Sequence, residues 1–134
     1  MTLKQMRWSI AILGICMPYL ARIPGTFTHG AQWLISYFGD GLGAVAFFGA
    51  FNVICWGAAL LATLGYRHAQ SAWFPTVAAL GSSAWLHSTV DLAADAQAAL
   101  ALVFIPFMTL PFTATGWIIG HLVDRYLQST RPAA

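Results

Sequence analysis

The residues best suited to chemistry in this sequence are one imidazole and two carboxylates that follow it at intervals of four. His87 is followed by Asp91 and Asp95, and side chains four residues apart share one face of a helix. One interpretation is a weak metal-binding or proton-binding cluster, completed by Arg22 or His29 from an earlier segment. Because two carboxylates and one imidazole without a further fixed ligand form a poor zinc signature, we favour a hydrogen-bonded histidine near a helix end. We call His87, Asp91, Asp95 and Arg22 the outer polar cluster.

A second pattern is a helix face made only of small and polar residues, which we call the small-residue face. Its members recur at steps of four, three, four and four: Thr109, Thr113, Gly116, Gly120 and Asp124. The two glycines form a GxxxG motif, which lets helix backbones approach closely in a membrane. We favour packing inside one bundle over the alternative, a seam with a second copy or a partner.

The remaining unusual residues have structural explanations. Asn52 is the one strongly polar side chain near the middle of a predicted membrane span, and an interhelical hydrogen bond accounts for it. Pro106 and Pro111 predict a bend in the last helix. We expect no disulfide between Cys16 and Cys55, because buried thiols in a span behave as small apolar groups.

No catalytic, phosphate-binding or lipid-anchor motif occurs in the sequence. We therefore predict no catalytic residue, no metal site and no cofactor. A haem ligated by both His87 and His121 is excluded in the topology given below, since the two lie at opposite membrane faces. We expect His121, Asp124 and Arg125 to form a local polar cluster at the inner end of the last helix.

The elements that position these residues follow from the composition. The chain has 134 residues, of which 59% are hydrophobic and only 7% are charged, whereas soluble domains carry about 25% charged residues. Three uncharged intervals, 41–66, 68–90 and 96–123, each exceed the roughly 20 residues that a helix needs to cross a bilayer. The composition thus predicts an integral membrane protein and argues against a disordered or soluble chain.

A shorter apolar stretch near the N-terminus predicts one more span. It lies between Arg7 and Arg22, whose side chains can extend toward the interfaces. A cleavable signal peptide is the alternative, but a small residue is missing at Tyr19, two positions before Ala21. We predict a four-helix transmembrane bundle with spans at about 8–23, 42–66, 72–90 and 96–123.

The distribution of charges predicts the orientation. With four spans, one side holds five basic residues, Lys4, Arg7, Arg67, Arg125 and Arg131, and the other side holds only Arg22. The positive-inside rule places both termini in the cytoplasm. The segment AADAQAALALVFIP also resembles segments of small bacterial inner-membrane proteins, which is the location we predict. The basic residues are scattered singly, so we expect no nucleic-acid binding.

The connection between the first two predicted spans is long, and its apolar residues recur at a regular interval. Ala31, Leu34, Ile35 and Phe38 recur at helical spacing. We predict a short amphipathic helix over about 28–38, started by Thr28 and stopped by Gly39. It lies flat in the outer interface or, as the alternative, packs as a lid over the bundle.

These observations predict an all-α integral membrane protein whose partners are lipid and a membrane protein or a second copy. The leading hypothesis is a non-enzymatic module, an accessory subunit or an immunity-type binding protein, that works through helix contacts or its outer face. The alternative is a small oligomeric channel or transporter lined by Asn52, Ser82, Ser83 and Thr113. A third hypothesis is a membrane enzyme that uses the outer polar cluster.

Overall fold

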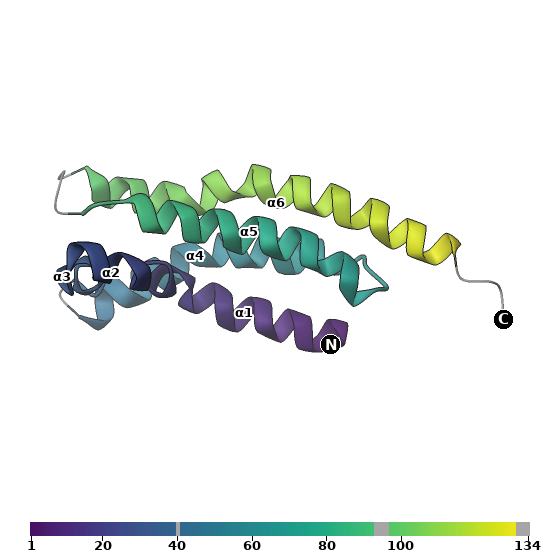
Figure 1. Cartoon of the computed structure of the whole chain (residues 1–134), viewed down its shortest axis with the longest axis horizontal. Helices are drawn as coiled ribbons and strands as arrows, with labels where there is room; N and C mark the ends of the chain where they lie inside the picture. Colours follow the sequence, from purple (N-terminus) through teal and green to yellow (C-terminus); the bar gives the residue numbers. More distant parts are fainter. Residues whose placement is uncertain (40, 93–96, 131–134) are drawn as a thin grey trace.

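The computed structural model describes residues 1–39, 41–92 and 97–130. These residues form helices and no strand: α1 (Leu3–Leu20), α2 (Ile23–His29), α3 (Gln32–Ile35), α4 (Leu42–Ala62), α5 (Ala69–Thr89) and α6 (Ala98–Ser129). The four long helices lie side by side along one axis, and α2 and α3 cross one end of them (Figure 1). We call residues 23–39 the lid and the end that they cover the lid end. The opposite end holds Lys4, Arg7, Arg67 and Arg125, and we call it the basic end.

Three helical segments are long and apolar enough to cross a membrane: Leu3–His29, Leu42–Ala62 and Leu100–Ser129. The fourth long helix, α5, has 21 residues but is more polar, and its buried residues include Ser71, Thr76, Ser83 and His87. It packs against α1, α4 and α6. These four polar side chains therefore face other helices of the bundle, where hydrogen-bond partners are within reach.

Helix limits differ from the predicted spans mainly at the basic end. The first helix begins at Leu3 rather than near residue 8, because Thr2 and Gln5 form a reciprocal capping box. The last helix continues to Ser129, beyond the predicted end at 123, and runs through Pro106 and Pro111. Thr109 donates its hydroxyl to the carbonyl oxygen of Pro106 at 2.6 Å.

The predicted single helix over 28–38 is wrong. Two short helices replace it, separated at Gly30, whose φ of 80° interrupts the helical backbone. Thr28 lies inside α2 and donates its hydroxyl to Gly25 rather than capping a new helix. Gly39, with φ of 47°, does end the segment. The lid packs on the bundle, since the side chain of Tyr37 is fully buried in a cluster with residues of α6.

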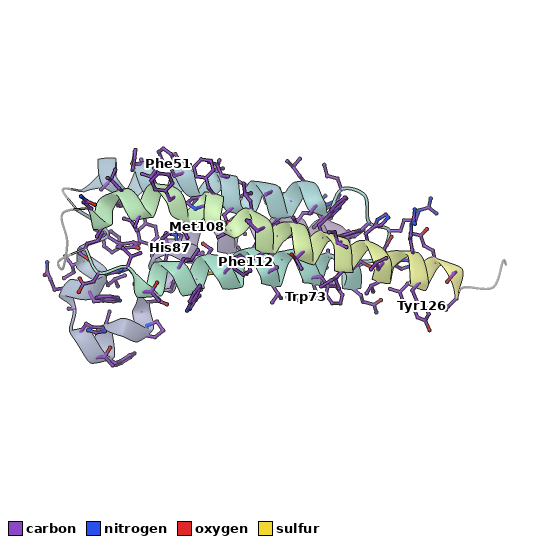
Figure 2. The ribbon with its side chains drawn as sticks, turned by 90° about the horizontal axis from the view of Figure 1, so that it is seen from above. Phe51, Trp73, His87, Met108, Phe112 and Tyr126 are labelled. Carbon is purple, nitrogen blue, oxygen red and sulfur yellow. The ribbon has the colours of Figure 1, made fainter. Side chains whose placement is uncertain are left out.

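The interior consists of two apolar clusters. Toward the basic end lie Met6, Ile10, Cys55, Ala59, Tyr66, Ala72 and Ala79. Toward the lid end lie Tyr37, Leu102 and Ile105. Large apolar side chains also cover the outside, and Trp73 and Tyr126 project away from the ribbon whereas His87 lies between helices (Figure 2). Such an extensive exposed apolar surface is unusual for a protein in water and matches a lipid environment.

Candidate functional site

Arg22 is the central residue at the lid end. It occupies the junction where α1 has ended and α2 begins, with Pro24 in the first turn of α2. Its side chain is fully buried. Nε donates to the carbonyl oxygen of Trp33 at 2.7 Å, and one terminal nitrogen donates to that of Val90 at 2.6 Å. The same nitrogen lies 3.3 Å from the carbonyl oxygen of His87.

Two aromatic rings enclose the guanidinium of Arg22. Its Cζ atom lies 3.9 Å from the ring centroid of Trp33 and 4.0 Å from that of Tyr37. A desolvated cation gains about 2 kcal/mol or more from such a ring. Because Val90 and His87 belong to the end of α5, the cation also meets the negative end of that helix dipole. The lid is therefore joined to α5 through one buried charge.

The phenol of Tyr37 connects this cation to His87. Burial raises the pKa of Tyr37 to about 12, although the neighbouring Arg22 acts in the opposite direction. The hydroxyl is therefore protonated at neutral pH. It lies 3.1 Å from Nδ1 of His87, to which it donates when the imidazole carries its proton on Nε2. Among the described residues Nε2 of His87 is buried without a hydrogen-bond partner.

The structure only partly assembles the outer polar cluster. His87 is 3% exposed on α5, but Asp91 is not on the same helical face, because α5 ends at Thr89 and Val90 is extended. Asp95 lies outside the described residues. No group of three or more histidine, cysteine or acidic side chains that could hold a metal ion is found in ranges 1–39, 41–92 and 97–130.

A cavity of about 470 Å³, whose lining includes several polar residues, opens beside Arg22. Its walls come from the lid and from the segment after α5: Arg22, His29, Gln32, Trp33, Ser36, Asp91 and Leu92. The imidazole of His29 stacks on the indole of Trp33, with the ring centroids 4.5 Å apart. Gly25 makes room for that indole, since a Cβ atom there would lie 2.3 Å from Nε1 of Trp33. We call this space the lid cavity.

Asn52 forms the interhelical hydrogen bond expected of it. Its side chain is 1% exposed, and Nδ2 donates to the carbonyl oxygen of Gly14 on α1. Ser83 on α5 lies within 3.5 Å of the amide oxygen. Asn52 thus links three helices, and its amide is occupied within the chain.

The small-residue face of α6 packs against α5. A Cβ atom on Gly116 would lie 2.6 Å from the carbonyl oxygen of Phe74, and one on Gly120 would lie 2.6 Å from that of Ser71. No space remains at these two glycines for a second chain. On α4 and after it, Gly49, Gly57 and Gly65 have no neighbour within 4 Å of such an atom.

Asp124 belongs to a different cluster from the predicted one with His121 and Arg125, which are both exposed. Its carboxylate accepts hydrogen bonds from the start of α5. The donors are the backbone N–H groups of Arg67 and His68, Nδ1 of His68 at 3.0 Å and the hydroxyl of Ser71 at 3.0 Å. A carboxylate at a helix N-terminus complements the helix dipole.

Arg7 plays the corresponding role at the end of α4. It donates from Nε to the hydroxyl of Thr63 at 3.2 Å and from a terminal nitrogen to the Thr63 carbonyl at 2.9 Å. The positive charges of Arg7 and Arg22 thus stabilise the C-terminal ends of α4 and α5, and the negative charge of Asp124 stabilises the N-terminal end of α5. Their position near predicted span ends was visible in the sequence. Their partners at those helix ends, 53 to 68 residues away, were not.

No protein-family model, curated protein or solved structure is found to match this chain.

Proposed function

We propose that this chain is a non-enzymatic binding protein of the bacterial inner membrane that holds a polar segment of a partner protein in the lid cavity. An accessory subunit or an immunity-type protein works in this way. The chain would cross the bilayer four times, with the basic end in the cytoplasm and the lid at the outer face.

The four-span arrangement rests on α5 as well as on the three more apolar segments. Its 21 residues extend about 31 Å at 1.5 Å per residue, which matches the hydrocarbon thickness. The basic end carries Lys4, Arg7, Arg67 and Arg125, whereas Arg22 is the basic residue of the lid end and is buried. This asymmetry supports the orientation.

The observation that carries the proposal is the fixed guanidinium of Arg22 beside a preformed cavity with several polar residues in its wall. Carbonyl oxygens and two aromatic rings hold the guanidinium in place, so the cavity wall needs little reorganisation when a partner binds. His29, Gln32, Ser36 and Asp91 then supply donors and acceptors around the space. A concave site with several converging polar groups suits recognition of a polar loop or peptide.

Site-specific photocrosslinking in cells tests this function. A photoreactive residue at Gln32, in the lid cavity, is compared with one at Phe27, which is on the lid but does not line the cavity. We expect a defined protein adduct from position 32 that disappears when Asp91→Arg places a long basic side chain in the cavity. The proposal is wrong if position 32 gives no adduct, or if positions 27 and 32 give the same adduct irrespective of Asp91.

The alternative, an oligomeric channel or transporter, has less support. Asn52, Ser83 and Thr113 are buried, and their side chains make hydrogen bonds within the bundle. A polar path along them would require these bonds to break or the helices to separate.

A further inference from the structure

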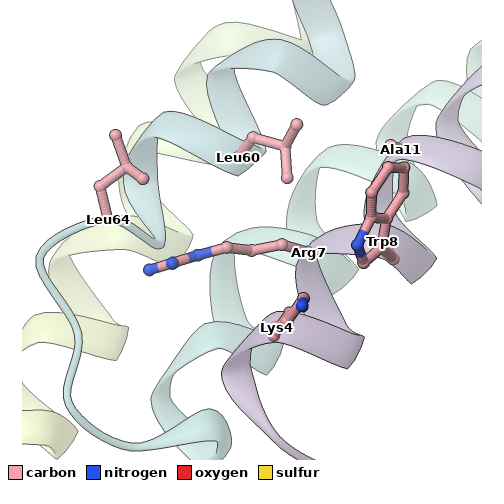
Figure 3. A pocket seen from close by; sticks show the side chains of 6 residues that line it. All are labelled: Lys4, Arg7, Trp8, Ala11, Leu60 and Leu64. Carbon is pink, nitrogen blue, oxygen red and sulfur yellow. The ribbon is translucent and has the colours of Figure 1, made fainter.

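A groove lies between α1 and α4 at the basic end, far from the lid. It encloses about 360 Å³ and is lined by Lys4, Arg7, Trp8, Ala11, Leu60 and Leu64. The side chain of Arg7 extends across it from α1, and Leu60 of α4 and Leu64, which follows the end of α4, line its other side (Figure 3).

The groove divides into a charged part and an apolar part. Lys4 and Arg7 are one helical turn apart, so their two positive charges lie on the same side of α1. Trp8 is 64% exposed beside them, and an indole of this kind favours the level of the lipid headgroups. The remaining lining side chains, Ala11, Leu60 and Leu64, are apolar.

Arg7 is already fixed in position for an anion. Two of its nitrogens donate to Thr63, which holds the guanidinium across the groove. Its other terminal nitrogen makes no hydrogen bond to residues 1–39, 41–92 or 97–130. Lys4 is exposed, so an anion can reach its ammonium without displacing a partner that the structure shows.

We propose that this groove binds one anionic phospholipid, with its phosphate at Lys4 and Arg7 and the start of an acyl chain along Ala11, Leu60 and Leu64. The occupant must be negative at one end and apolar along the rest, and it must be present where a bundle meets the bilayer surface. From Lys4 to Ala11 the helix rises about 10 Å, which accommodates a headgroup and the first part of a chain. Basic residues at the cytoplasmic surface attract anionic lipid in the same way.

Native mass spectrometry of the full chain in detergent tests the proposal. The protein is supplied with phosphatidylglycerol, with phosphatidylcholine or with inorganic phosphate. We expect one retained phosphatidylglycerol, little phosphatidylcholine, and no displacement of the lipid by phosphate. Lys4→Gln should weaken retention about five-fold, the effect of one cation near anionic lipid.

Arg125→Gln is the matched control, because Arg125 is an exposed basic residue at the same end but does not line the groove. It should leave retention unchanged. A second variant, Ala11→Phe, fills the apolar part and should lower retention while both charges remain.

Equal losses in Lys4→Gln and Arg125→Gln would overturn the proposal, because they would show a diffuse surface charge effect. Unchanged retention in Ala11→Phe, equal retention of phosphatidylcholine, or displacement by phosphate would overturn it as well. The inference requires a bilayer around the bundle but not partner binding in the lid cavity, so a negative crosslinking result does not affect it.

Discussion

The guanidinium of Arg22 donates a hydrogen bond of 2.6 Å to the carbonyl oxygen of Val90, 68 residues later in the chain. This bond connects the residue that precedes the lid to the end of α5. The rings of Trp33 and Tyr37 also contact the guanidinium. The buried cation therefore holds the lid against the end of α5.

Replacing Arg22 by lysine should destabilise the protein by about 2–4 kcal/mol, because lysine cannot supply the forked donors and leaves buried carbonyl groups unpaired. Chemical unfolding in detergent micelles, followed by tryptophan fluorescence, measures this loss. Arg67→Lys, at an exposed side chain, should change stability by less than about 0.5 kcal/mol. Equal losses of stability in the two variants would show that the buried contacts of the Arg22 guanidinium do not stabilise the fold.

Tyr37 should ionise only in strongly alkaline solution. Its pKa is raised to about 12 by burial, against about 10 for an unfolded tyrosine. The folded state favours the neutral phenol, so this contribution to stability is complete below pH 10 and is lost as the pH rises from 10 to 12.

The ultraviolet absorbance of tyrosinate checks this prediction. The difference between the titration of the wild-type protein and that of Tyr37→Phe isolates Tyr37. The same difference in denaturant should shift to about pH 10. A transition near pH 10 in the folded protein would contradict the burial of the phenol against Arg22 and His87.

Two glycines inside long helices should respond differently to replacement by alanine. Gly120→Ala should destabilise the bundle by about 1–3 kcal/mol, because the new methyl group would lie 2.6 Å from the carbonyl oxygen of Ser71. Gly49→Ala meets no atom within 4 Å and should be neutral or stabilising by up to about 1 kcal/mol. Unfolding in mixed micelles gives both values, and the reverse order would exclude the close α5–α6 contact.

Helix positions were predictable because they depend on local patterns. The long uncharged intervals correspond to α4, α5 and α6. Thr109, Gly116 and Gly120, which recur at helical spacing in the sequence, are buried on α6. The segment 28–38 was predicted wrongly because its apolar residues have a helical period, whereas Gly30 adopts φ of 80° and divides it. A period reports which side chains share a face only if the backbone continues without a break.

The sequence by itself determined a composition typical of membrane proteins, the long helices, and the spacing of the small and polar residues on α6. Only the tertiary structure decided which glycines are in close contact, that Tyr37 approaches His87, and that Asp124 accepts hydrogen bonds from His68 and Ser71. The physical reason is that helix formation and apolar periodicity depend on neighbours within a few residues. Side-chain partners across helices depend instead on how segments 50 or more residues apart pack against one another, which no local pattern specifies.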